Sequence, residues 1–143
     1  MELWTQIARG TLFLSISAGV HLALIIFSLP WLTRVAQATK DQFRAHRAGL
    51  LISLAFGLTV FGHTLQVWIW AGAFLWYGAI DGVDTAVYFS LSTYTTLGYG
   101  DIILDDTMRT FGAFASVCGM LTFGISTAFL VGMIGRVLPK GLH

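Results

Sequence analysis

Two glycines separated by a single residue, Gly98 and Gly100, lie in segment 95–101, which reads TTLGYGD. Neighbouring residues of an ordinary strand alternate in direction. Glycine adopts positive φ without a Cβ penalty, so glycines at alternate positions allow consecutive carbonyl oxygens to face one line. Rows of carbonyl oxygens are the ligands that replace the water around a potassium ion. The spacing therefore predicts a cation pathway lined by backbone oxygen atoms.

The residues between the glycines have complementary expected roles. Thr96 adds a hydroxyl oxygen to its carbonyl at the inner mouth of the pathway. Leu97 and Tyr99 point away from the axis, where their side chains hold the ribbon open at a fixed width.

The motif T-L-G-Y-G-D resembles the T-x-G-Y-G-D signature of the potassium-channel pore-domain family, which is the standard example of a carbonyl-lined filter. The resemblance covers about residues 48–135, and the filter is its specific part. It implies a homotetramer, because four filter loops surround the ion. It also implies an outer helix 49–75, a pore helix 84–95, a filter 96–100 and an inner helix 109–135. By resemblance, the K+ ligands are carbonyls of Thr96, Leu97, Gly98 and Tyr99, with Gly100 completing the filter.

The same resemblance assigns residues that support the filter. Tyr99 is expected to pack on Tyr88 and Phe89 of the pore helix, or on a neighbour's copies; alternatively these are ordinary interfacial aromatics. Some relatives clamp the acid after the filter with a pore-helix acid and a tryptophan.

In this sequence those two places hold Ser92 and Tyr88, so Asp101 has neutral partners and we expect a less tightly held outer filter. Thr95 completes the supporting set, and Gly119 is a candidate hinge of the inner helix.

Composition places the chain in a membrane. It has 143 residues, of which 56% are hydrophobic and 10% charged, with a mean hydropathy of +0.77. Soluble domains carry roughly 25% charged residues. The single cysteine, Cys118, excludes an internal disulfide framework, and a net charge of +1 gives no reason to expect nucleic acid. No catalytic motif is present, so we expect neither an enzyme nor a soluble substrate, and no cofactor beyond permeant K+.

Three apolar runs, 11–29, 49–75 and 110–135, are close to the ~20 residues that span a bilayer. Segment 84–95 is too short to span and is expected to be a re-entrant helix, with Asp84 as its N-cap. The predicted fold is an all-α membrane protein with three transmembrane helices. Its expected parts are an extra N-terminal helix 1–32, a basic cytoplasmic linker 33–48 and a pore domain 49–143.

The charges predict an orientation in the cell membrane. Linker 33–48 has four basic residues against Asp41, and Arg136 and Lys140 follow the last run. Basic loops stay in the cytoplasm, so the N-terminus is expected outside and the C-terminus inside. Segment 76–109 has five aspartates against Arg109, which would concentrate cations at the outer mouth.

Two features leave alternatives open. His21 and His63 lie mid-span and would be neighbours if their helices pack; they are either cross-helix hydrogen-bonded histidines or pH sensors. They also permit a membrane haem or redox subunit, while a weakly selective cation channel is the nearer alternative function.

A stripe of small residues on the last run either packs against another helix or lines the inner pore; it comprises Gly124, Ala128, Gly132 and Gly135.

Overall fold

The computed structural model describes residues 2–137, which form four helices and no strand. The helices are α1 (Leu3–Ala38), α2 (Arg44–Trp76), α3 (Val83–Tyr94) and α4 (Arg109–Val137). Three of them, α1, α2 and α4, are long and apolar enough to cross a membrane, whereas α3 has only 12 residues. The predicted all-α fold with three membrane spans is confirmed for the described residues. Two residues used in predicting the orientation, Met1 and Lys140, lie outside them.

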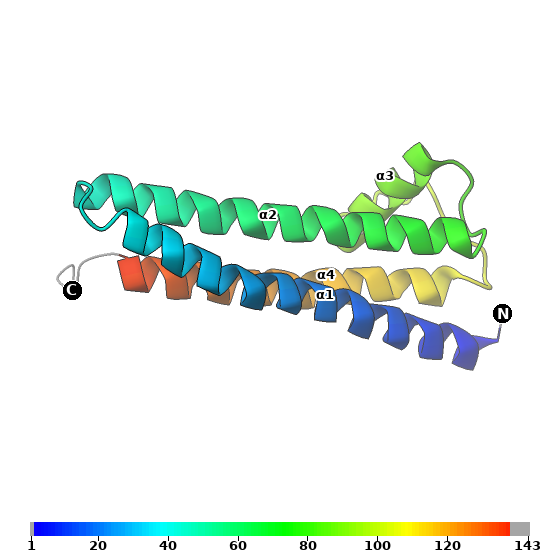
Figure 1. Cartoon of the computed structure of the whole chain (residues 1–143). Helices are drawn as coiled ribbons and strands as arrows, with labels where there is room; N and C mark the ends of the chain where they lie inside the picture. Colours follow the sequence, from blue (N-terminus) through cyan, green and yellow to red (C-terminus); the bar gives the residue numbers. More distant parts are fainter. Residues whose placement is uncertain (1, 138–143) are drawn as a thin grey trace.

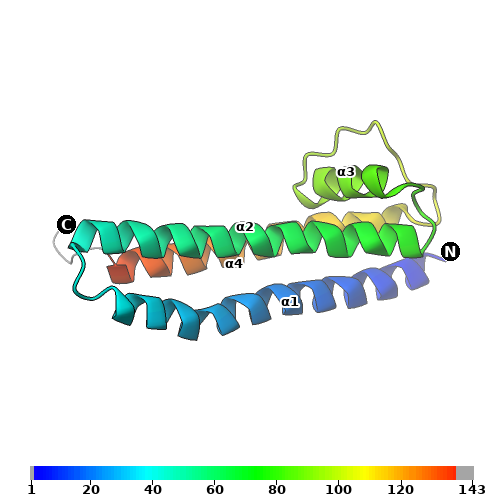
Figure 2. The same cartoon turned by 45° about the horizontal axis from the view of Figure 1, so that its top comes forward.

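The three long helices lie side by side, and α3 sits beside one end of the bundle (Figure 1). Helix α1 packs on α2 and α4, and α3 packs on the same two helices. Figure 2 shows α1 and α3 on opposite faces of this pair. Helix α1 starts at the end that carries α3, while the α1–α2 connection and the end of α4 lie at the other end (Figure 1).

The connection between α1 and α2 is shorter than linker 33–48, because helix covers most of that segment. Between α1 and α2, only residues 39–43 are non-helical. Alanine, arginine and glutamine favour helix, so the charged residues there mark the edge of the apolar span rather than the end of the helix. Helix α1 also runs through Pro30.

Aromatic rings fill the bundle at the end that carries α3. Trp70 and Phe74 of α2 are fully buried against Phe111 of α4, with ring centroids 5.6 and 6.0 Å from the Phe111 ring. Phe89 of α3 meets Phe74 edge-on at 5.1 Å. Edge-to-face pairs such as this contribute about 0.5–1.5 kcal/mol beyond the burial of their area. The cluster therefore fixes α3 against α2.

A glutamine of α1 holds the start of α4. The Gln6 side chain accepts hydrogen bonds from the backbone N–H groups of Thr110 and Phe111 at 3.0 and 3.4 Å, and it donates one to the Asp106 carbonyl at 3.1 Å. The first N–H groups of a helix have no partner within it. Gln6 thus caps α4 from another helix.

Candidate functional site

Ribbon 96–100 follows α3 directly and has an alternating backbone. Thr96, Gly98 and Gly100 have φ of 62°, 55° and 77°, while Leu97 and Tyr99 do not have positive φ. The alternation expected from the two glycines is confirmed and extends to Thr96, a residue type that rarely adopts this conformation. Such alternation turns successive carbonyls to one side. All five residues are exposed in the single chain.

Backbone hydrogen bonds tie the start of the ribbon to α3. The N–H groups of Leu97 and Gly98 both donate to the Ser92 carbonyl, at 2.9 and 3.1 Å. The Thr96 N–H donates to the Thr93 carbonyl at 3.0 Å, which also accepts the Ser116 hydroxyl of α4 at 2.8 Å. These bonds fix the direction in which the chain leaves the helix.

The hydroxyl of Thr95 closes the last turn of α3 by donating to the Leu91 carbonyl at 2.7 Å. The first turn of α3 differs from expectation, because its N-cap is Gly82, while Asp84 lies inside the turn. A carboxylate there still complements the positive end of the helix dipole.

The outer end of the ribbon is braced by one side-chain pair. The Tyr88 hydroxyl donates to an Asp101 carboxylate oxygen at 2.7 Å. This hydrogen bond raises the pKa of Tyr88, since the neighbouring carboxylate disfavours a second negative charge. Of the two residues expected near Asp101, Tyr88 therefore makes the contact through its side chain, whereas Ser92 holds the ribbon through its carbonyl.

The expected packing around Tyr99 is absent within the described chain. Its side chain is 69% exposed, and Phe89 packs on Phe74 instead. Packing of Tyr99 against a neighbour's aromatic residues stays a prediction.

Gly119 lies where α4 crosses the end of α3. A Cβ at this position would lie 1.9 Å from the carbonyl oxygen of Tyr94 and 2.9 Å from its carbonyl carbon. The glycine thus allows two backbones to approach closely, immediately before the ribbon begins. Its role as a hinge stays a prediction.

The small-residue stripe of α4 has no such contact within the chain. Gly124, Gly132 and Gly135 are exposed, and a Cβ at each would meet nothing within 4 Å. Packing against another copy and lining of an inner pore both stay predictions for Gly124 and Gly135, whereas Ala128 and Gly132 line a cavity that Leu29 of α1 also lines.

Comparison with protein families supplies the assignment. A family model described as "Ion channel" matches residues 50–136, which include α3, the ribbon and almost all of α2 and α4. The chain belongs to this ion-channel family. Comparisons with curated proteins and with solved structures return no match. The protein is therefore a multi-pass membrane protein with an ion-channel domain, and the whole of α1 lies outside the matched region.

The ion channel's two mid-span histidines lie together, as their positions predicted. The rings of His21 and His63 have centroids 4.9 Å apart. The Nε2 atom of His21 lies 2.8 Å from the Ser126 hydroxyl, and the Nδ1 atom of His63 lies 2.8 Å from the Tyr94 hydroxyl. The ring spacing leaves no room for a porphyrin between them, which disfavours the haem alternative.

Tyr94 links this histidine pair to the ion-channel ribbon. Its ring is fully buried, and its hydroxyl lies 2.6 Å from that of Thr122 as well as 2.8 Å from His63. Tyr94 is also the last residue of α3. Reasoning from the sequence missed both Tyr94 and Gln6. A buried tyrosine usually finds a hydrogen-bond partner, so the mid-span polar residues could have indicated the former.

Proposed function

We propose that this ion channel is selective for potassium. The observation that carries the proposal is the alternating backbone of ribbon 96–100, with positive φ at Thr96, Gly98 and Gly100. Four such ribbons around an axis would present stacked rings of carbonyl oxygens in place of the water around K+. The expected ligands are the carbonyls of Thr96, Leu97, Gly98 and Tyr99.

We propose a homotetramer as the functional assembly. A single chain contributes one ribbon, and its ribbon side chains Leu97 and Tyr99 are 56% and 69% exposed. Ile103, just beyond the ribbon, is 82% exposed. Large apolar side chains gathered beside a filter favour burial against other copies.

The charge distribution supports an orientation with the ribbon facing outward. Basic residues gather at the end opposite the ribbon, where α1 meets α2 and where α4 ends (Figure 1). Cytoplasmic segments carry such an excess of lysine and arginine. The N-terminus would then lie outside and the C-terminus inside. The aspartates of segment 76–109 would surround the outer mouth and attract cations.

Ion flux from liposomes tests the proposal. Purified protein is reconstituted with internal K+, and flux is compared with that of Gly98→Ala and Gly57→Ala. Gly98 has φ +55°, so alanine there costs about 1–2 kcal/mol of backbone strain. Gly57 lies within α2 without a positive φ, and a Cβ there meets nothing within 4 Å. We expect Gly98→Ala to lose K+ flux and Gly57→Ala to keep it.

Reversal potentials in mixed sodium and potassium then distinguish a potassium-selective channel from a weakly selective cation channel. A potassium-selective filter sets the reversal potential by the potassium gradient alone. A reversal potential that follows sodium equally would replace the proposal with a weakly selective cation channel. Equal flux of Gly98→Ala and wild type would show that the ribbon does not line the pathway.

A further inference from the structure

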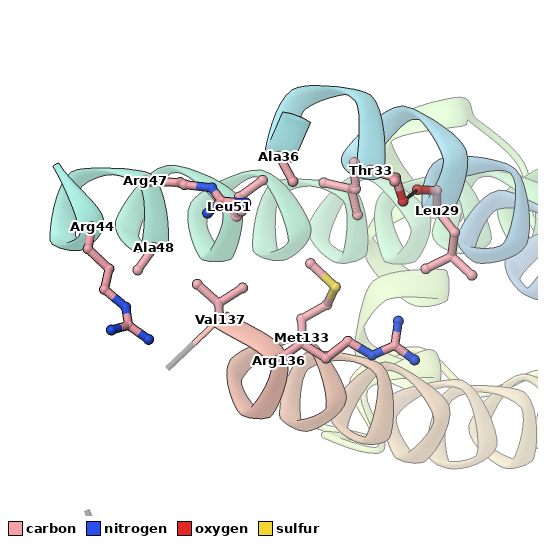
Figure 3. A pocket seen from close by; sticks show the side chains of 11 residues that line it. Leu29, Thr33, Ala36, Arg44, Arg47, Ala48, Leu51, Met133, Arg136 and Val137 are labelled. Carbon is pink, nitrogen blue, oxygen red and sulfur yellow. Dashed lines mark hydrogen bonds between the residues drawn. The ribbon is translucent and has the colours of Figure 1, made fainter. Parts of the chain in front are cut away.

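A cavity of about 290 Å³ opens between α1, α2 and α4 at the end opposite the ribbon. Three arginines line it, Arg44 and Arg47 from α2 and Arg136 from α4. Its other walls are mainly apolar and include Leu32 and Leu51. Figure 3 shows Arg47 close to Leu51, while Arg44 and Arg136 extend in different directions. The space is far larger than one water needs.

The three arginines have no ion-pair partner within residues 2–137, and Asp41 in the α1–α2 connection does not pair with them. Arg109 and Asp106 form the ion pair found within residues 2–137, and this pair lies at the other end of the bundle. The Nε atom of Arg47 is buried and has no hydrogen-bond partner in the described chain. Buried polar atoms are nearly always paired, so the Arg47 guanidinium keeps hydrogen-bonding capacity that the described chain does not use.

The start of α2 adds to the attraction for an anion. The N-cap, Phe43, offers no side-chain hydrogen bond, and the first turn contains no acidic residue. The N–H groups and the dipole at such a helix end favour negative charge. The arginine side chains and the N-terminus of α2 therefore both favour a negatively charged ligand.

A second cavity of about 250 Å³ continues from the first along α1 and α4. The two share Leu29, Met133 and Arg136. Ala128, at the far end of the second cavity, lies eight residues before Arg136, which places it about 12 Å deeper along the helix. Apart from Arg136, its lining residues are apolar. The combined space is therefore basic at the membrane edge and apolar further in.

We propose that the two cavities together bind one anionic phospholipid of the adjacent leaflet. Its phosphate contacts Arg47, with Arg44 and Arg136 beside the headgroup, and one acyl chain follows the second cavity. A soluble anion fits less well, because Arg44 and Arg136 do not converge on one compact ion and because apolar walls continue the space (Figure 3). Anionic headgroups also concentrate where basic residues follow a membrane span.

The site depends on α1, which supplies Leu29, Leu32, Thr33 and Ala36 to its walls. Arg44 and Arg47 lie before residue 50, where the match to the ion-channel family begins. The lipid would therefore join a helix outside the matched region to the two helices of the pore domain. The inference requires membrane insertion and is independent of potassium selectivity.

Lipid titration of the purified full-length protein tests the proposal. Phosphatidylglycerol or phosphatidylcholine is added in detergent, and lipids retained per chain are counted by native mass spectrometry. We expect one phosphatidylglycerol per chain at concentrations where phosphatidylcholine is not retained. Loss of one arginine contact corresponds to roughly fivefold weaker binding, so Arg47→Gln should weaken it about fivefold.

A matched control separates a built site from diffuse attraction. Arg34 is exposed on α1 near the same end of the bundle but does not line the cavity, so Arg34→Gln should bind within twofold of wild type. Ala36→Phe keeps every charge but fills the cavity, and we expect it to lose the bound lipid. Melting temperature in phosphatidylcholine reports whether each variant is folded.

Three results would overturn the inference. Equal weakening by Arg34→Gln and Arg47→Gln would indicate surface attraction without a site. Equal retention of phosphatidylcholine would indicate an apolar groove without headgroup recognition. Displacement of the lipid by millimolar inorganic phosphate would assign the arginines to a soluble anion. A protein that binds phosphatidylglycerol but passes no ions would refute the proposed function and leave this inference intact.

Discussion

Replacing Gly119 with alanine tests how the membrane helices hold the ribbon. An added Cβ would lie 1.9 Å from the Tyr94 carbonyl oxygen, whereas ordinary contact begins at 3.4 Å. Helices α3 and α4 would therefore have to separate by roughly 1.5 Å, a large shift in a close-packed interior. Both clashing groups are fixed to backbone, so no rotamer relieves the contact. Tyr94 precedes Thr96 by two residues, and the shift would reach the ribbon directly.

Overpacking of this kind costs about 1–3 kcal/mol. For a chain of this size each kcal/mol lowers the melting temperature by roughly 2–4 °C. We expect Gly119→Ala to melt at a lower temperature in detergent and to lose potassium flux in liposomes. Gly72→Ala and Gly57→Ala make the same chemical change on α2, where a Cβ meets nothing within 4 Å. Both should melt no lower than wild type, because alanine favours helix over glycine.

The reasoning is refuted if Gly119→Ala melts and conducts like the two controls. A third pattern is also informative. Unchanged melting temperature and selectivity with a changed open probability would assign Gly119 to bending of α4, as the resemblance to potassium channels implies, rather than to close packing.

Further predictions concern contacts made by single polar groups. Tyr88→Phe removes the hydrogen bond to Asp101, so we expect faster current decay at low external potassium in electrophysiology. Because the pKa of Tyr88 is raised, the stabilisation is fully present below about pH 10 and lost above it; wild-type decay should accelerate only there, and the decay of Tyr88→Phe should not. Tyr94→Phe leaves Nδ1 of the half-buried His63 without this hydrogen bond, which should cost about 1 kcal/mol in thermal melting, and no loss would contradict the contact. Gln6→Ala uncaps α4 and should cost about 1 kcal/mol by the same measurement.

Features that depend on local sequence could be predicted. Hydropathy fixes the three spans because each needs ~20 apolar residues. Alternate glycines indicate the positive φ of the ribbon because glycine tolerates it. The proximity of His21 and His63 followed from their equal depth in two helices, and the ring distance of 4.9 Å confirms it.

Features that depend on how the helices face one another could not be predicted from the sequence. Gln6 caps a helix that begins more than a hundred residues later, and nothing near it in the sequence indicates that partner. The contact between Gly119 and Tyr94 depends on where α3 crosses α4, so the sequence indicated only a hinge by resemblance. The positive φ of Thr96 is set by the bonds that return the chain to α3, which no propensity scale contains.

The length of α1 has a mechanical consequence. Its 36 residues form a helix about 54 Å long, whereas the hydrocarbon core of a bilayer is about 30 Å thick. Even with some tilt, a stretch at the basic end must stand in the headgroups or in water. Peptide groups there can exchange a lost helical bond for a hydrated one, which is not available deeper in the bilayer. Unwinding or reorientation of α1 therefore costs least free energy at its basic end. We expect any movement of the bundle to start there.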